Sequence, residues 1–169
     1  MIHAHPQSAR RRGIAAVEFA LLLPFIMVIL LGIWEVGRLI NADEMVNNAA
    51  REGARQASTG LRTNAQVVAE VQYYLYQAMV GQGMPASRAQ QVVNDAVITV
   101  QDLNSPGTDV GQATQLDQIQ VTVSIPFSDV RWVALSLITN PSTRVNGQAT
   151  FYCLKDQQFP TGVTAPAGF

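Results

Sequence analysis

The chain has 169 residues and a net charge of −1, with 48% hydrophobic and 14% charged residues. This length suits one modest domain together with a membrane anchor. Three arginines lie in residues 1–13, so the rest of the chain carries eight basic and twelve acidic side chains, a balance of −4. That balance disfavours nucleic-acid binding. The single cysteine, Cys153, excludes an intramolecular disulfide, and we expect it to be half-buried in a strand.

A basic leader opens the chain and an apolar run follows it. Residues 1–12 end in three arginines and show no core-forming pattern, whereas residues 14–34 are apolar except for Glu18. The run is longer than the apolar part of a secretory signal, and no small-residue cleavage site follows Trp34. It has the length of a transmembrane helix, about 20 residues. The preceding arginines predict a cytoplasmic N-terminus and an extracytoplasmic C-terminal part.

Two residues of the apolar run are unusual for a membrane helix. Glu18 is expensive there, because a charge costs roughly 2.5 to 3.5 kcal/mol at the centre of a bilayer. Pro24 removes one hydrogen-bond donor and crowds the carbonyl of Ala20. We expect a kink or a loosened turn at Pro24, although membrane helices tolerate proline where neighbouring groups satisfy the freed carbonyl.

The helical pattern continues beyond the expected membrane segment. Apolar residues recur at three- and four-residue spacing and alternate with charged residues of both signs. A helix over residues 14–57 is about 66 Å long, more than twice the hydrocarbon thickness of about 30 Å. Roughly half of it should stand outside the bilayer with one apolar face in need of cover, and Gly60 is a plausible stop. The apolar positions are Val36, Leu39, Ile40, Met45, Val46, Ala49, Ala50, Gly53 and Ala57, and the charged ones are Glu35, Arg38, Glu44, Arg51, Glu52 and Arg55.

Two shorter helices are predicted next. Thr63 with Gln66, and Ser87 with Gln90, each have the form of a capping box in front of an apolar helical pattern. The glycine- and proline-rich residues 81–85 separate the two helices. Tyrosines cluster at residues 73, 74 and 76, where we favour packing of the rings over a recognition surface.

From residue 97 the apolar period changes to two. Strands are predicted at residues 97–103, 117–127 and 145–154, with a turn at residues 104–107. The apolar residues 130–138 are too few to span a membrane and are interpreted as a buried loop or short helix. The predicted fold is therefore α+β, with a long N-terminal transmembrane helix extended outside the membrane, two short helices and a small antiparallel sheet. Its parts are a leader (1–13), the helix (14–60), an extracytoplasmic domain (61–156) and an irregular tail (157–169).

The inventory of reactive side chains is poor. The two histidines, His3 and His5, lie in the leader, far from Cys153. This disfavours a zinc site or a histidine-dependent nucleophile. Three acids of the turn-rich region, Asp102, Asp109 and Asp117, fit a solvated loop better than a weak calcium site. We expect no enzymatic activity, no metal, no cofactor and no small-molecule substrate.

The sequence from Gly13 to Phe19, GIAAVEF, resembles the processing site of type IV prepilins, in which a membrane protease cuts after a glycine and a glutamate stands fifth in the mature chain. The longer run through Pro24, Gly32, Glu35, Gly37 and Arg38 to the segment AAREGAR at residues 49–55 resembles the TadE-like family. This family consists of minor pilins, or pseudopilins, of the tight-adherence (Tad/Flp) type IV pilus.

The resemblance implies a structural function in a bacterial pilus system. A prepilin peptidase would cut after Gly13, with Ile14, Glu18 and Phe19 as further processing residues. Assembly would involve Glu18 and Pro24, together with other pilin subunits and the assembly platform. The protein would be a single-pass inner-membrane protein with a periplasmic C-terminal domain, and assembly could incorporate it into the pilus.

The residues near the expected cleavage site and the length of the chain make the implied function more specific. Cleavage would leave an α-amine on Ile14, with which the Glu18 of a neighbouring subunit could pair; alternatively Glu18 snorkels to the headgroups. Many type IV pilins begin with a methylated phenylalanine, where this chain has Ile14. The chain is also far longer than the major pilins of this system, which favours a minor or priming role.

A second hypothesis is a membrane-tethered extracytoplasmic binding module, in which the N-terminal helix serves only as an anchor. A third, an anchored hydrolase, is disfavoured because the histidines it would need are missing from the body of the chain.

Overall fold

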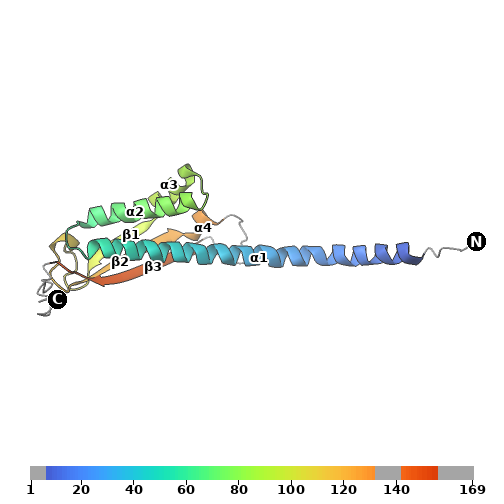
Figure 1. The fold of residues 1–169 in the computed structure, drawn as a ribbon, viewed down its shortest axis with the longest axis horizontal. Coiled ribbons are helices and arrows are strands. Elements are labelled where there is room, and N and C mark those ends of the chain that lie inside the picture. The colour runs from blue at the N-terminus through green and yellow to red at the C-terminus, as the bar shows by residue number, and fades with distance from the viewer. Residues whose placement is uncertain (1–6, 132–141, 156–169) are drawn as a thin grey trace, which may run out of the picture.

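The computed structural model describes the backbone of residues 7–131 and 142–155, and the side chains from residue 15 onward within those ranges. A long helix projects from a small α+β head, which confirms the predicted fold class (Figure 1). The elements are α1 (Gln7–Ala57), α2 (Asn64–Gly81), α3 (Ala86–Asp95), β1 (Val97–Asp102), the 3-10 turn η1 (Val110–Gln112), β2 (Gln118–Pro126), α4 (Phe127–Val130) and β3 (Arg144–Tyr152).

Helix α1 begins earlier than the sequence pattern indicated. It starts at Gln7, so the arginines of the leader belong to the same helix as the apolar run. Alanine and arginine are good helix formers, which accounts for this extension. At the other end α1 stops at Ala57, and Gly60 adopts a φ of 64°, a left-handed conformation that favours glycine. The predicted stop at Gly60 is thus confirmed.

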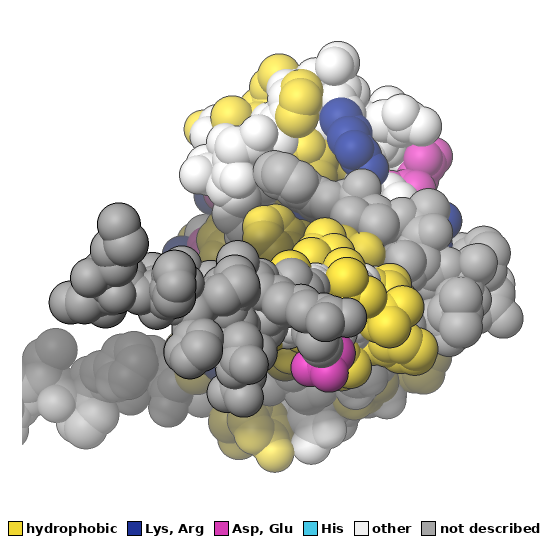
Figure 2. Space-filling model, turned by 90° about the vertical axis from the view of Figure 1, so that its right-hand side faces the viewer, with side chains coloured by type: hydrophobic (Ala, Val, Ile, Leu, Met, Phe, Trp, Pro, Cys, Tyr) yellow, Lys and Arg dark blue, Asp and Glu magenta, His cyan; other side chains and the backbone are white. Residues whose placement is uncertain are grey.

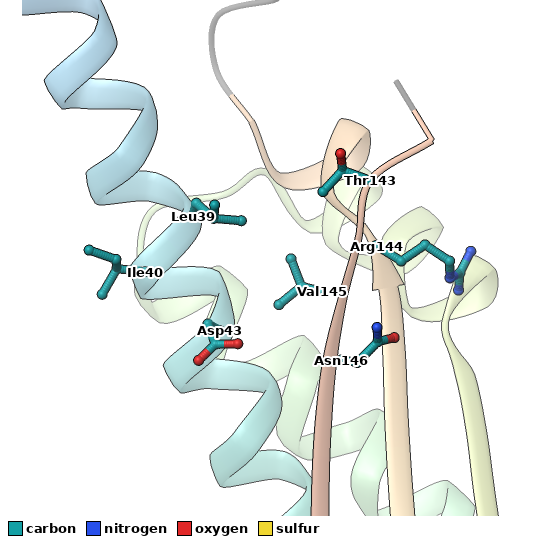
Figure 3. A pocket seen from close by; sticks show the side chains of 7 residues that line it. All are labelled: Leu39, Ile40, Asp43, Thr143, Arg144, Val145 and Asn146. Atoms are coloured by element: carbon teal, nitrogen blue, oxygen red, sulfur yellow. The ribbon is translucent and has the colours of Figure 1, made fainter. Parts of the chain in front are cut away.

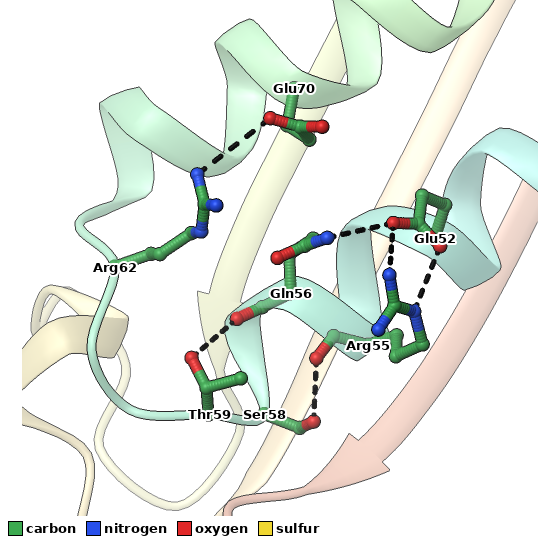
Figure 4. A network of polar contacts seen from close by, with 7 residues as sticks. All are labelled: Glu52, Arg55, Gln56, Ser58, Thr59, Arg62 and Glu70. Carbon is green, nitrogen blue, oxygen red and sulfur yellow. Dashed lines mark hydrogen bonds and ion pairs between the residues drawn. The ribbon is translucent and has the colours of Figure 1, made fainter.

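Polar side chains close the C-terminal end of α1 (Figure 4). The hydroxyls of Ser58 and Thr59 donate to the carbonyls of Arg55 and Gln56, each at 2.8 Å. Arg55 also donates two hydrogen bonds to the carboxylate of Glu52, at 2.9 and 2.6 Å. These bonds from Arg55 hold the pKa of Glu52 below its ordinary value. The last carbonyls of the helix, which lack intrahelical donors, are therefore partly satisfied.

One of the two predicted capping boxes forms. The backbone N–H of Gln66 donates to the Thr63 hydroxyl at 3.4 Å, and the N–H of Thr63 donates to the Gln66 side chain at 3.0 Å. The prediction at Ser87 was wrong, because α3 begins two residues earlier, at Ala86, with Pro85 as its N-cap and without a side-chain cap. The ψ of Pro85 is 138°, an extended conformation that places the helix start directly after the proline, and Ser87 falls inside the first turn.

The sheet has the order β1-β2-β3, and both strand pairs are antiparallel. The predicted alternation in the middle strand is confirmed, because every second residue of β2 from Ile119 to Ile125 is buried and the residues between them are only partly covered. The apolar face of the sheet packs against α1 and α2. The core consists of that face, small residues of α1, and apolar residues of α2 and α3.

Two predictions about single residues need correction. Cys153 is fully buried just beyond β3, with its Sγ 3.9 Å from the carbonyl oxygen of Ala113, rather than half-buried. Asp102 is also buried, because its Oδ1 accepts the backbone N–H groups of Asn104 and Ser105 and thereby forms the turn after β1. Of the apolar residues 130–138, Val130 ends α4 and is buried, and residues 132–138 lie outside the described part of the chain.

Candidate functional site

The part of α1 that leaves the head is apolar and exposed. We call residues 15–34 the projecting segment. Its side chains are exposed apart from Leu31 and Gly32, which are half-buried. Viewed from the end at which α1 projects, apolar side chains dominate the described surface of the helix (Figure 2). The large exposed apolar residues are Val17, Phe19, Leu21, Leu22, Leu23, Phe25, Ile26, Met27, Val28, Ile29, Leu30, Ile33 and Trp34.

The projecting segment has the dimensions of a membrane span. At 1.5 Å per residue it is about 30 Å long, close to the hydrocarbon thickness of a bilayer. Among the described residues, α1 is long and apolar enough to cross a membrane, and its most apolar stretch has no cover from the head. A helix of this kind is consistent with a single-pass membrane anchor. An exposed apolar surface of this size requires lipid or a protein partner.

The residues predicted for processing and assembly all lie on α1. Gly13 and Ile14 are inside the helix rather than at its start, because α1 begins at Gln7. Glu18 and Phe19 are exposed on the projecting segment, about one turn further along. The helix therefore brings these four residues together at one end, far from the head.

Pro24 lies in the middle of the projecting segment and is exposed. Helix α1 continues through it as one element, which Figure 1 draws as an unbroken ribbon. The proline therefore does not end the helix. A loosened turn around the carbonyl of Ala20 stays a prediction.

Polar side chains of α1 and α3 lie where α1 enters the head, and we call Glu35, Arg38 and Arg88 the polar collar. The sequence pattern placed Glu35 and Arg38 with the alternating charged residues, but Glu35 is only 1% exposed and Arg38 is half-buried. The Arg38 guanidinium donates to the carbonyl of Val130 at 2.8 Å. Burial, followed by the nearby charge of Arg88, lowers the pKa of Arg38. The contact of Arg38 with Val130, 92 residues further along the chain, has no signal in the sequence.

Arg88 completes this collar from α3. Its guanidinium donates to the carbonyls of Asp129 and Arg131, at 3.2 and 3.1 Å. Together with Arg38 it supplies donors to the end of α4, where carbonyls lack intrahelical partners and cations are favourable. Sequence reasoning did not identify Arg88. The collar fixes the head to α1 at the boundary of the projecting segment.

Beyond the collar, α1 carries small residues where the head packs on it. We call residues 42–57 the packed segment. A Cβ on Gly53 would lie 2.5 Å from Cγ2 of Val71 and 3.1 Å from Cγ1 of Val121. A Cβ on Gly147 of β3 would lie 2.6 Å from the backbone carbonyl of Val46. The segment AAREGAR thus serves close packing of α1 against α2 and the sheet. Its three alanines, Ala49, Ala50 and Ala54, are fully buried, as is Ala57 just beyond it.

A groove of about 530 Å³ lies beside the collar, between α1 and the start of β3 (Figure 3). Its lining combines apolar residues with one acid and one base. Among residues 15–131 and 142–155, no group of three or more histidine, cysteine or acidic side chains is placed to hold a metal ion. The residues that line the groove are Leu39, Ile40, Asp43, Thr143, Arg144, Val145 and Asn146.

The projecting apolar helix and the small α+β head define a protein whose exposed helix is consistent with a single-pass membrane anchor. The family model described as TadE-like protein matches residues 13–55, from Gly13 into the packed segment. This match confirms the TadE-like resemblance for the N-terminal segment and suggests a protein associated with the Tad pilus. No curated protein and no solved structure matches the chain.

Proposed function

We propose that this chain is a minor pilin of a tight-adherence pilus. It would be cut after Gly13 by a prepilin peptidase and would take part in pilus assembly or priming through its N-terminal helix. The observation that carries this proposal is the exposed projecting segment, which lies within the TadE-like match to residues 13–55. The partners would be the peptidase, other pilin subunits and the assembly platform.

The position of Gly13 within α1 affects how easily the helix opens at the proposed cleavage site. A protease needs an accessible backbone, so the helix must open locally at the site. Glycine costs about 1 kcal/mol relative to alanine inside a helix, which makes opening easiest there. Cleavage removes the three arginines of the leader and leaves a cationic α-amine on Ile14. The cut therefore replaces a strongly basic segment by a single charge at the membrane face.

Glu18 provides a partner for that new charge. It lies about 6 Å along the helix axis from Ile14 and is exposed, so its carboxylate can face a neighbouring subunit. In an apolar environment an unpaired carboxylate is costly, and an amine from the neighbour would compensate it. The pair would favour one axial stagger between adjacent helices.

Replacement of Gly13 tests the processing step. We expect Gly13→Ala to block maturation, because alanine adds a methyl group at the cut and strengthens the helix there. N-terminal sequencing of the membrane-bound protein should begin at Met1 in the variant and at Ile14 in the unaltered chain. Gly37→Ala is the matched control, since Gly37 is an exposed glycine of α1 with open space around it. An unaltered chain that still begins at Met1 refutes processing.

Replacement of Glu18 tests the assembly step separately. We expect Glu18→Ala to be processed normally but to lower the number of pili by at least about tenfold, because the neighbouring amine loses its partner. Glu44→Ala, which removes an exposed acid further along α1, should leave the number of pili unchanged. Normal piliation by the Glu18 variant contradicts the pairing.

Exchange of the whole membrane segment separates a pilin from a tethered module. If residues 14–34 are replaced by an unrelated membrane helix, a pilin loses incorporation into the pilus. Retained function of the chimera favours the anchor-only hypothesis.

A further inference from the structure

The tyrosines at residues 73, 74 and 76 differ in their surroundings. Tyr74 and Tyr76 are half-buried and pack against the hydrophobic core, which confirms the packing expected for them. Tyr73 instead is 61% exposed and lies outside the core. A tyrosine ring has a large apolar face and a polar tip, so an exposed ring offers both kinds of contact to a ligand.

A cleft of about 470 Å³ lies between α2 and α3, with Tyr73 in its wall. Residues three or four apart share one face of a helix, as Tyr73 and Tyr76 do on α2. Gln90 and Asn94 have the same relation on α3, and Val93, at 4% exposed, lies deepest. The volume falls within the range of about 300 to 1,000 Å³ that is typical of pockets for small ligands. The cleft is lined by Gln72, Tyr73, Tyr76, Gln90, Val93 and Asn94.

Three amide side chains supply the polar part of the lining. An amide group both donates and accepts hydrogen bonds, through its NH₂ and its carbonyl oxygen. The Gln90 amide donates to Oδ1 of Asn94 at 3.1 Å, which fixes these two side chains relative to each other. That bond uses neither the Gln90 carbonyl oxygen nor the Asn94 NH₂, so α3 presents one acceptor and one donor group to the cleft.

The six residues that line the cleft include no charged side chain. The acid Glu70 of α2 lies outside the lining and pairs with Arg62 at 3.7 Å. A charged ligand would lose solvation in the cleft without gaining an opposite charge, so the lining favours a neutral one. The cleft also lacks the two carboxylates that glycoside cleavage uses, which limits its role to binding.

We propose that the cleft between α2 and α3 binds a neutral saccharide. A sugar ring has an apolar C–H face, which would stack on the ring of Tyr73, and hydroxyls at its rim, which would bond to the amides of Gln72, Gln90 and Asn94. The inference goes beyond the proposed function and does not depend on it. Both helices belong to the head (Figure 1), so the cleft stays accessible when the projecting segment lies in a membrane.

Replacement of the exposed tyrosine tests the stacking. Saturation-transfer NMR is applied to the full-length chain in micelles of a phosphocholine detergent, which has no sugar headgroup, with cellobiose, maltose, lactose and diacetylchitobiose as probes. We expect at least one of these neutral disaccharides to receive saturation on its ring C–H protons, and Tyr73→Ala to lower that signal at least about tenfold. Tyr152→Ala is the matched control, because Tyr152 is 56% exposed on β3 and does not line the cleft. Absence of signal from all four probes, or equal signals from the two variants, overturns the proposal.

A change of charge tests the class of ligand. Asn94→Asp keeps an oxygen for the bond from Gln90 but replaces the NH₂ by a carboxylate. We expect it to weaken binding of the neutral disaccharide about tenfold, the effect of one lost hydrogen bond. Asn48→Asp, which adds the same charge at an exposed position of α1, should bind like the unaltered chain. A disaccharide of glucuronic acid should bind the unaltered chain at least about tenfold more weakly than the neutral probe, and equal or tighter binding overturns the assignment of a neutral ligand.

Discussion

The projecting segment and the packed segment belong to one continuous helix, α1, but their side chains have different surroundings. The projecting segment presents leucine, isoleucine, valine and phenylalanine side chains to its surroundings, whereas the packed segment buries alanine and glycine against the head. The projecting segment is apolar on all sides and has Glu18 as its one charged residue, whereas the packed segment also carries five charged residues outside its buried face. The apolar side chains differ in size as well: large side chains of the projecting segment face a deformable environment, and small ones of the packed segment let α2 and the sheet approach the helix axis.

The collar lies between the projecting segment and the packed segment. Glu35 and Arg38 are withdrawn from solvent there, and Arg38 binds the end of α4. A substitution on one side of this collar should therefore affect membrane insertion, and one on the other side should affect the stability of the head.

The largest effect is expected from a charge in the projecting segment. Val28→Asp places a carboxylate near the middle of the apolar run and should disfavour insertion by roughly 3 kcal/mol, or more than about 100-fold. The stability of the head should not change, because Val28 is 66% exposed and does not touch it. Alkaline extraction of membranes measures insertion. Asn48→Asp, at an exposed position of the packed segment, is the control, and equal extraction of both variants contradicts a membrane role for the projecting segment.

A methyl group between β3 and the packed segment should be nearly as costly. Gly147→Ala places its Cβ 2.6 Å from backbone atoms of Val46, which cannot rotate away, so we expect a loss of about 2 to 3 kcal/mol in the free energy of unfolding. Denaturant unfolding of the full-length chain in detergent, followed by circular dichroism, measures it. Gly81→Ala, with open space around the new methyl group, should stay within about 0.5 kcal/mol of the unaltered chain.

Two glycines of α1 sharpen the comparison within one helix. Gly53→Ala should destabilise the head by about 1 to 2 kcal/mol, because the contact with Val71 outweighs the better helix propensity of alanine. Gly37→Ala should be neutral or stabilising by up to about 1 kcal/mol, since nothing lies within 4 Å of its Cβ. The double variant Gly53→Ala, Val71→Ala should lose less free energy of unfolding than the sum of the losses in the two single variants, because the smaller side chain at residue 71 makes room for the new methyl group. The same cost for both glycines contradicts the close packing.

The smallest effect concerns pH. The folded-state pKa of Glu52 is lowered by the hydrogen bonds from Arg55, so its contribution to stability is present above the unfolded pKa of about 4.3. It is lost as the pH falls through the folded pKa. Glu52→Gln should flatten the acid limb of the stability profile slightly, because the pair is largely exposed and screened. Glu44→Gln, at an exposed acid without a described ion pair, is the control in the same thermal unfolding experiment.

Local patterns in the sequence predicted most of the fold. The alternation in β2 and the capping box at Thr63 depend on neighbours within a few residues, and both are confirmed. The box at Ser87 failed although its residues fit, because Pro85 started the helix earlier. Hydrophobic periodicity identifies the buried face of the packed segment. The small size of the residues on that face indicates, in addition, that other elements approach the helix closely.

The remaining features depend on contacts between distant parts of the chain. The contacts of Arg38 and Arg88 follow from where the end of α4 meets α1 and α3, about 40 to 95 residues apart in the sequence. The order of the strands in the sheet is also left undetermined by the strand patterns. The processing residues Gly13, Ile14, Glu18 and Phe19 came from the resemblance, and the structure adds that all four lie near one end of α1, with Glu18 and Phe19 exposed.

The intact mass of the protein recovered from membranes is the most direct test of the pilin hypothesis. The hypothesis predicts the mass of a chain that begins at Ile14, and the same spectrum reports any added methyl group. A mass that includes residues 1–13 would contradict cleavage after Gly13, and with it the free amine that Glu18 is proposed to bind.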